Sequence, residues 1–274
     1  MSSTKISSVI LEKHLMFSDF LKRDVIIDCY YHASFSQNVS VPLLLINDGQ
    51  DLRTMHFEDI LEDLNAEQSI TMVFCAAIHC SSDRKNEYGT ARVLDYKGRG
   101  AKAADYTAFV MKELLPFLRK TYLVISFSEK AFAGFSLGGL SAMDIAWNHP
   151  YEFTKVGVFS GSMWWRDKAQ DEEDFDEDEN RIMQRQVREG NYYSWMKFFF
   201  EVGTKDETAD RNNNGVIDSI DDTKAVIDEL KLKGYDSISD IRYLELEDGF
   251  HNVDTWARAF PVFLKWGWGK GNNL

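Results

Sequence analysis

A serine between glycines carries the clearest chemical signal in this sequence. Ser136 lies in the motif Gly134–Gly139 (GFSLGG), after the strand-like run Lys130–Ala133 and before the helix-like run Leu140–Asn148. A tight turn from strand to helix crowds the residues around its centre, so small neighbours are needed. The serine then projects at the helix N-terminus, where backbone N–H groups can stabilise a negative oxygen. This context predicts a nucleophile elbow; the alternative interpretation is a glycine-rich helix start with a capping serine.

A histidine and a carboxylate late in the chain supply the partners that such a serine needs. His251 follows the last predicted strand and precedes the final predicted helix, where a general base is expected. The other histidines precede Ser136 or lie on its helix: His14, His32, His56, His79 and His149. The run Phe198–Val202 leads into a loop where Asp206 can orient the imidazole and stabilise its cation. Glu207 and Asp210 compete for this role, and a solvated acidic turn explains the same loop without chemistry.

An oxyanion hole requires two backbone N–H groups near the serine. One is expected from Leu137, which follows the serine, and the other from the loop after the predicted strand Val41–Ile46. That loop has the sequence NDGQD, and Gln50 is the candidate donor. An ordinary Asp-Gly turn is the alternative interpretation.

Two further groups of residues are candidates for the substrate pocket. Arg84, Glu87 and Tyr88 lie in the loop after Ile78, at the same predicted sheet edge; an exposed ion pair explains the charged members equally well. Trp164 and Trp165 follow a Ser-Gly-Ser turn and can form an aromatic wall, although tryptophans also bury large areas in ordinary cores.

The segment Asp210–Asp221 has the spacing of an EF-hand calcium loop. Oxygen ligands stand at positions 1, 3, 5, 9 and 12, glycine stands at position 6, and a carbonyl is available at position 7. The expected ligands are Asp210, Asn212, Asn214, Val216, Asp218 and Asp221. Asp221 replaces the usual glutamate, and no helix leads in, so an asparagine-rich turn without metal is the alternative. Structural calcium is thus a hypothesis, and hydrolysis itself needs no cofactor.

Short apolar runs alternate with helical patterns along the chain. Two early segments alternate like antiparallel edge strands, Ile6–Met16 and Val25–His32. Six later runs resemble strands covered on both faces: 41–46, 71–78, 130–133, 156–159, 198–202 and 241–246. The expected helices are 57–64, 103–118, 137–148, 223–233 and 253–265. We therefore predict one α/β domain over 1–274, with a mostly parallel sheet between helices and a lid-like insertion at 161–194.

Composition limits the partners and the compartment. The formal charge of −13 repels phosphate backbones and anionic lipid heads, so neither nucleic acid nor a membrane surface is an expected partner. Part of this charge lies in Asp167–Glu179, which is typical of a solvated segment. The three cysteines, Cys29, Cys75 and Cys80, occur in apolar segments and are expected as free thiols in a reducing compartment. With no leader or membrane-spanning pattern, a cytoplasmic protein is expected.

The sequence resembles the esterases of the esterase D and enterochelin-esterase-like group, which are α/β-hydrolases. The resemblance runs from about Val41 to the C-terminus. It rests on the motifs LINDGQ (45–50), RKNEY (84–88), ELLP (113–116), GFSLGG (134–139), GTKD (203–206) and GFH (249–251), and on Trp256. It implies Ser136 as nucleophile, His251 as base, the Asp206 loop as acid and a backbone hole at Gln50 and Leu137. Phe250 departs from the family pattern, in which a second glycine is common, and the separate sandwich domain of some siderophore esterases is not expected in this chain.

The residues and the resemblance together predict hydrolysis of a small carboxylic ester through an acyl-enzyme. Thioesterases, acyltransferases and peptidases use the same constellation, and a non-catalytic binding protein with this fold is the alternative of another class. A homo-oligomer is compatible with the sequence.

Overall fold

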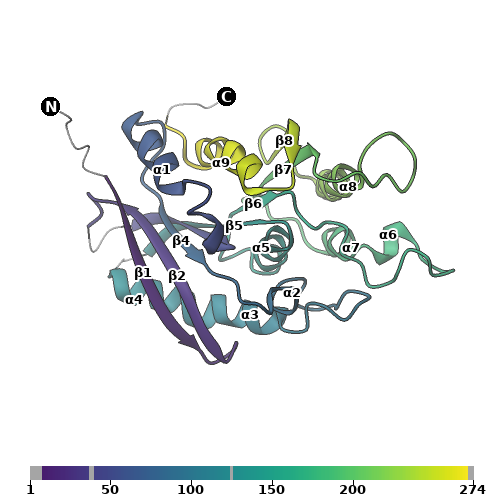
Figure 1. The fold of residues 1–274 in the computed structure, drawn as a ribbon, viewed down its shortest axis with the longest axis horizontal. Helices are drawn as coiled ribbons and strands as arrows, with labels where there is room; N and C mark the ends of the chain where they lie inside the picture. The colour runs from purple at the N-terminus through teal and green to yellow at the C-terminus, as the bar shows by residue number, and fades with distance from the viewer. Residues whose placement is uncertain (1–7, 37–39, 124–125, 271–274) are drawn as a thin grey trace.

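A single mixed sheet forms the centre of the molecule (Figure 1). The computed structural model describes residues 8–36, 40–123 and 126–270, and within them eight strands join this sheet. The strands are β1 (Val9–Ser18), β2 (Arg23–His32), β3 (Ser40–Asn47), β4 (Phe74–Ile78), β5 (Ser126–Phe135), β6 (Lys155–Phe159), β7 (Lys197–Lys205) and β8 (Ile241–Phe250).

The strand order is β1-β2-β4-β3-β5-β6-β7-β8. The pairs β1/β2 and β2/β4 are antiparallel, and every other pair is parallel. This arrangement confirms the predicted α/β-hydrolase fold with an antiparallel N-terminal edge. The first two residues of the expected strand Ile6–Met16 lie outside the described residues.

Helices cover both faces of the sheet, as Figure 1 shows. The helices are α1 (Phe57–Ala66), α2 (Arg84–Glu87), α3 (Ala103–Phe109), α4 (Leu115–Tyr122), α5 (Leu137–Asn148), α6 (Glu177–Asn180), α7 (Ile182–Glu189), α8 (Asp218–Lys233) and α9 (Val253–Trp268). Alternate side chains of β3 show the two layers: Leu44 and Ile46 pack with α1 and α9, whereas Leu43 and Leu45 pack in the cluster that holds α3, α4, α5, α7 and α8. Both faces are thus buried, which explains the continuous apolar runs of the parallel strands.

The second half of the segment expected as a lid-like insertion packs into the core. Helix α7 lies within residues 161–194 and buries Ile182, Met183 and Val187 in the core. Its apolar residues are few and are separated by Gln and Arg, so its pattern is too weak to predict a core helix. The acidic run ahead of it contains α6, none of whose residues is buried, as a solvated segment should be.

The cysteines form no disulfide in the described part of the chain. Cys29 and Cys75 are buried, as expected, and Cys80 is half-buried. Burial raises the pKa of the Cys29 thiol to about 12, so this thiol is not a reactive nucleophile. Among the described residues, no helix has the length and apolar character needed to cross a bilayer.

Candidate active site

Ser136 lies at the sharp turn from β5 to α5. Its backbone has φ 54° and ψ −120°, a conformation that a non-glycine residue adopts only when its surroundings impose it. The Ser136 N–H donates to the Phe159 carbonyl at 2.8 Å, which fixes the turn against β6. A Cβ atom at Gly134 would overlap the Gly138 carbonyl group, so the turn closes only with glycine there. The half-buried side chain stands at the N-terminus of α5.

The loop after β3 packs directly against this turn. Gly138 makes the approach possible, because a Cβ there would overlap the Asp48 carboxylate. The Asn47 side chain donates to the Gly138 carbonyl at 2.8 Å and accepts from the Tyr106 hydroxyl at 2.5 Å. These contacts hold the expected oxyanion loop beside the serine.

Arg84 connects the two segments. Its Nε and Nη2 each donate to the Asp48 carboxylate at 2.7 Å, and Nη2 also donates to the Phe135 carbonyl at 3.2 Å. The Asp48 side chain is buried, so the pair is neither an exposed ion pair nor a free pocket cation. Arg84 therefore positions the β3 loop relative to the residue before Ser136.

Glu87 and Tyr88 do not line a pocket, contrary to expectation. The Glu87 side chain is only 2% exposed and binds both Nε and Nη2 of Arg23, each at 2.7 Å. Tyr88 is fully buried, and its hydroxyl accepts from the Asp48 N–H at 3.2 Å. The short helix α2 turns both side chains inward, which a four-residue polar sequence does not reveal.

The two expected oxyanion donors are free to bind a ligand. Gln50 lies on a 3-10 turn, Gly49–Asp51, and Leu137 is the first residue of α5. Within the described residues, neither N–H donates a hydrogen bond. Unpaired N–H groups beside a nucleophile are what an oxyanion hole requires, and their role stays a prediction.

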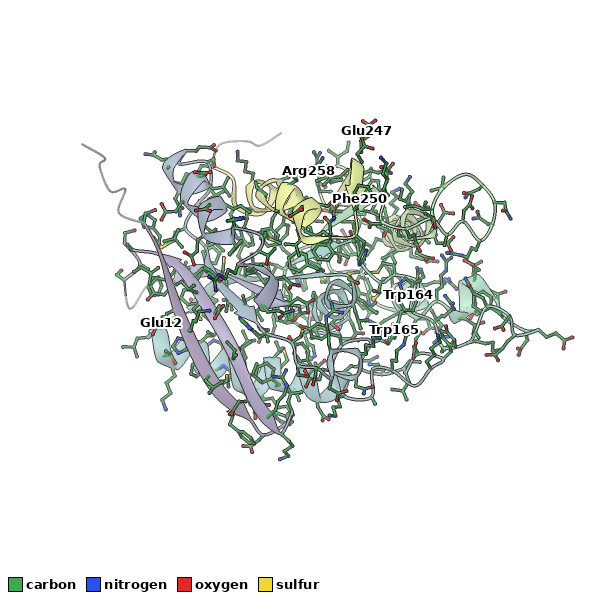
Figure 2. All side chains as sticks on the ribbon, viewed as in Figure 1. Glu12, Trp164, Trp165, Glu247, Phe250 and Arg258 are labelled. Carbon is green, nitrogen blue, oxygen red and sulfur yellow. The ribbon has the colours of Figure 1, made fainter. Side chains whose placement is uncertain are left out.

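His251 and Asp206 lie close together at the sheet edge that also carries Ser136. His251 follows β8, with its side chain 39% exposed, and its Nδ1 lies 3.8 Å from Oδ2 of Asp206, which is 1% exposed. This separation exceeds a hydrogen bond; such contacts often tighten only when substrate binds. Trp256 on α9 packs edge-on against the imidazole at 5.5 Å. In Figure 2 the region around His251 can be found by the labels of Phe250 and Arg258.

The competing carboxylates face elsewhere. Asp210 accepts from the N–H groups of Asn214 and Gly215 in its own loop, at 3.1 and 2.9 Å. Burial raises the pKa of Glu207, which lies near Ser219. Among the three candidates, only Asp206 lies within ion-pair distance of His251.

The two tryptophans have different environments (Figure 2). Trp165 is fully buried, so it belongs to the core and not to an aromatic wall. Trp164 is half-buried, and Arg99 lies over both rings at about 5 Å. Trp164 lines a cavity of about 210 Å³ together with Arg166, Gln170, Glu207, Arg211, Asp218 and Asp222. Because Glu207 follows Asp206 directly, this cavity adjoins the acid loop.

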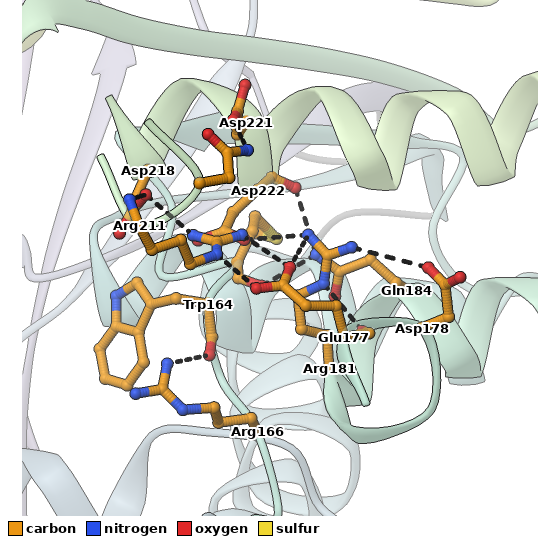
Figure 3. A network of polar contacts seen from close by, with 12 residues as sticks. Trp164, Arg166, Glu177, Asp178, Arg181, Gln184, Arg211, Asp218, Asp221 and Asp222 are labelled. Carbon is orange, nitrogen blue, oxygen red and sulfur yellow. Dashed lines mark hydrogen bonds and ion pairs between the residues drawn. The ribbon is translucent and has the colours of Figure 1, made fainter. Parts of the chain in front are cut away.

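A charged network beside this cavity ties the acidic segment to α8, as Figure 3 shows. Arg211 donates to both carboxylate oxygens of Glu177, at 2.5 and 3.0 Å, and to Asp222. Arg181 also binds Asp222, at 3.0 Å. The Asp222 side chain is buried, so the two guanidinium groups compensate its charge. Sequence patterns do not predict this network, because the acidic segment and α8 are far apart in the chain.

The predicted calcium loop is closed by its own hydrogen bonds. The Asn212 and Asn214 side chains donate to Asp221 at 2.9 and 2.8 Å, and Asp218 accepts from the Arg211 N–H at 2.8 Å. The Val216 N–H donates to Asn214 Oδ1 at 2.7 Å. No group of three or more His, Cys, Asp or Glu residues in the described ranges is arranged to hold a metal. Calcium would have to displace these internal contacts, so the ion stays a prediction.

Comparisons with known proteins identify the family of the chain. The sequence matches the family described as "Putative esterase" over residues 18–266. It is 24% identical over 241 residues to "Uncharacterized protein YbbA" of Bacillus subtilis (strain 168), a match that covers 85% of this chain and 87% of that protein.

Solved structures of esterases share the fold. The enterobactin esterase FES from Shigella flexneri superposes with a TM-score of 0.71 at 19% identity, covering 96% of this chain but only 59% of that one. The siderophore hydrolase EstB from Aspergillus nidulans gives a TM-score of 0.66 at 17% identity and covers 97% of both chains. At these identities the likeness shows the fold alone. The family match covers most of the chain, and the protein therefore belongs to this esterase family and has the α/β-hydrolase fold.

Proposed function

We propose that the protein is a serine carboxylic ester hydrolase that acts through an acyl-enzyme. The observation that carries the proposal is the backbone of Ser136, held at φ 54° and ψ −120° at the start of α5. A conformation of this kind costs about 1–3 kcal/mol, and it clusters at sites where the strain serves the chemistry. Unpaired N–H groups at Gln50 and Leu137 and the nearby edge that holds His251 support the same assignment.

Each of these residues has a separate role in the proposed reaction. The Ser136 Oγ attacks the ester carbonyl while His251 Nε2 takes its proton, and the N–H groups of Gln50 and Leu137 stabilise the oxyanion. His251 then returns the proton to the departing alcohol, which leaves an acyl group on Ser136. In the second half, His251 takes a proton from water, the hydroxide attacks the acyl carbonyl, and Ser136 recovers its proton as the acid leaves. Asp206 orients the imidazole and stabilises its positive charge throughout.

The cavity beside the acid loop supports a substrate with a ring. Trp164 offers an aromatic surface, and Arg166 lines the same cavity without an ion-pair partner in the described residues. An aromatic face and a guanidinium group together suit a ring that bears a polar substituent. One structural neighbour, with a TM-score of 0.68 at 18% identity, is a ferulic acid esterase.

Hydrolysis of a short-chain chromogenic ester by the wild type and by Ser136→Ala tests the proposal. The wild type should turn over the ester, and the variant should lose at least about 10³-fold in kcat, because nucleophile and base act as a unit. A parallel assay with the matching thioester and amide separates the esterase from a thioesterase or a peptidase. A wild type without turnover, or an equally active Ser136→Ala, contradicts the proposal.

A further inference from the structure

Glu201 is a buried carboxyl group that the proposed mechanism does not use. It lies on β7 ahead of Asp206 and is 0% exposed. Neither of its oxygens has a hydrogen-bond partner of normal geometry among the described residues, and the same is true of both Asp206 oxygens. Buried polar groups without partners are rare in native proteins, and each needs an explanation.

The two carboxyl groups lie on one face of β7. Side chains of residues 199, 201 and 203 project to the same side of the strand, because the side-chain period of a strand is two. A Cβ at Gly203 would overlap the Gly249 carbonyl group and would lie 2.7 Å from Asp206 Oδ1. The loop thus folds the Asp206 carboxylate back over Gly203, two residues from Glu201 on the same face, and Asp206 acts electrostatically on Glu201. Phe199, on the same face, packs against Phe263 of α9.

Few groups around Glu201 can compensate a negative charge. Besides Asp206, the titratable groups that act on it or respond to it are Arg258 of α9 and Tyr243 of β8. Arg258 is exposed and forms no ion pair with Glu201 in the described residues (Figure 2). The Ser160 hydroxyl, after β6, accepts from Trp256 Nε1 at 2.9 Å and keeps its own O–H as a donor, but its lowering of the pKa of Glu201 is smaller than the raising by burial. The surroundings therefore favour an uncharged Glu201.

Burial and the neighbouring Asp206 raise the pKa of Glu201 to about 8. Two buried carboxyl groups this close do not both ionise at neutral pH. The raised pKa places the proton on Glu201 at neutral pH.

We propose that Glu201 is a positioning residue of the catalytic site, whose neutral carboxyl group supports the Asp206 carboxylate and keeps it directed at His251. This role rests on the proposed function. A protonated carboxyl can donate its O–H to Asp206, which has no other donor in the described residues. An ionised Glu201 has no proton to donate and repels Asp206. The proton stays on Glu201 through the cycle, and no bond to substrate forms there.

Two substitutions separate this role from simple space filling. Glu201→Gln keeps the shape and an N–H donor but cannot ionise, whereas Glu201→Leu fills similar space without a donor. Glu201→Gln should keep kcat within about threefold of wild type, and Glu201→Leu should lose at least about tenfold in kcat with KM unchanged. A Leu variant with wild-type kcat, or a Gln variant as impaired as the Leu variant, overturns the proposal.

The pH profile adds a readout that packing alone would not change. Wild-type kcat/KM should fall as pH rises through about 8, when Glu201 ionises, and Glu201→Gln should lack this fall. Glu247→Gln, at the exposed end of β8, makes the same chemical change away from the site and should keep the wild-type profile. A fall that persists unchanged in Glu201→Gln overturns the assignment.

A stability measurement tests the protonation of Glu201 without turnover. The folded pKa of about 8 lies above the unfolded value of about 4.3, so the folded protein binds more protons between these values. Stability is lost across this window as pH rises, and Glu201→Gln avoids the loss. Its Tm should therefore rise relative to wild type across the window and then level off, whereas Glu247→Gln should show no such trend.

The outcomes distinguish the two proposals. A wild type without ester turnover overturns the proposed function and the positioning role with it, even where the Tm trend appears. An active wild type in which Glu201→Leu is equally active overturns the positioning role alone.

Discussion

At the scale of single residues, the site depends on contacts that keep Ser136 in a strained backbone conformation. The Phe159 carbonyl, the glycine at 134 and the loop held by Arg84 together impose it. The strain exposes the hydroxyl at the start of α5, where the helix dipole favours negative charge. An activated serine is therefore expected to react with electrophiles that ordinary serines ignore.

A serine-directed organophosphonate should label the protein once, at Ser136. Only a serine with a general base attacks phosphorus at neutral pH, so His251→Ala should abolish the adduct while the fold stays intact. Peptide mapping by mass spectrometry locates the label. An adduct on another serine, or undiminished labelling of His251→Ala, would show that the triad is wrongly assigned.

Asp206→Asn should lower kcat by about 10²–10⁴-fold, because the amide cannot stabilise the imidazolium ion. Asp210→Asn, in the same loop, is the matched control and should stay within about threefold of wild type. Steady-state kinetics at one pH near neutrality compares the two. If Asp210→Asn is the more damaging change, Asp210 is the triad acid.

Arg84→Lys should lower the free energy of unfolding by about 1–2 kcal/mol and kcat by about tenfold. Lysine keeps the charge but cannot bind Asp48 with two parallel N–H groups while it also reaches the Phe135 carbonyl. Urea unfolding and kinetics measure the two effects. The exposed neighbour Lys85→Gln is the control, and equal behaviour of the two variants would argue against a positioning role for Arg84.

At the scale of elements, the loop Asp210–Asp221 links the proposed triad acid, Asp206, to α8. Its Asp210 and Asp221 carboxylates bind loop N–H and amide groups, and its Arg211 joins the charged network at Asp222. Calcium binding there would replace the hydrogen bonds of these carboxylates with bonds from their oxygens to the metal. The loop can thus be ordered with or without metal, and a binding measurement separates these states.

If the loop binds calcium, the ion should raise the Tm by several degrees at millimolar concentration, and a chelator should reverse the change. Asp210→Asn combined with Asp221→Asn removes two of the expected ligands and should abolish the effect. Isothermal titration calorimetry supplies the affinity. No heat of binding at millimolar calcium would refute the metal hypothesis and leave the asparagine-rich turn.

The positions of the parallel strands and of the elbow were predictable because both depend on local patterns. Apolar runs located β3 to β8, and the glycines around Ser136 located the turn. The partners of Arg84 and Glu87 were not predictable, because Asp48 and Arg23 are distant in the chain and any arginine can pair with any nearby carboxylate. Glu201 lies in the run 198–202, which predicts a strand covered on both faces, but nothing in the sequence indicates that the Asp206 carboxylate folds back toward it.

At the scale of the whole molecule, the formal charge of −13 is the dominant property of the surface. Self-repulsion of this size weakens the compact state, and salt screens it. Raising NaCl from about 0.02 M to about 0.3 M should therefore increase the Tm by a few degrees, as measured by differential scanning calorimetry. A Tm that falls over this range would mean that ion pairs outweigh the net repulsion.

The position of β3 has a consequence for folding kinetics. This strand lies between β4 and β5, and its first residue, Ser40, meets Ser126, 86 positions later. Parallel pairs that close such long loops form slowly, whereas helices form early. Gln50 and Ser136 come together only after β3 has docked on β5. After dilution from denaturant, helical circular dichroism should recover first, and ester turnover should return with the slowest phase.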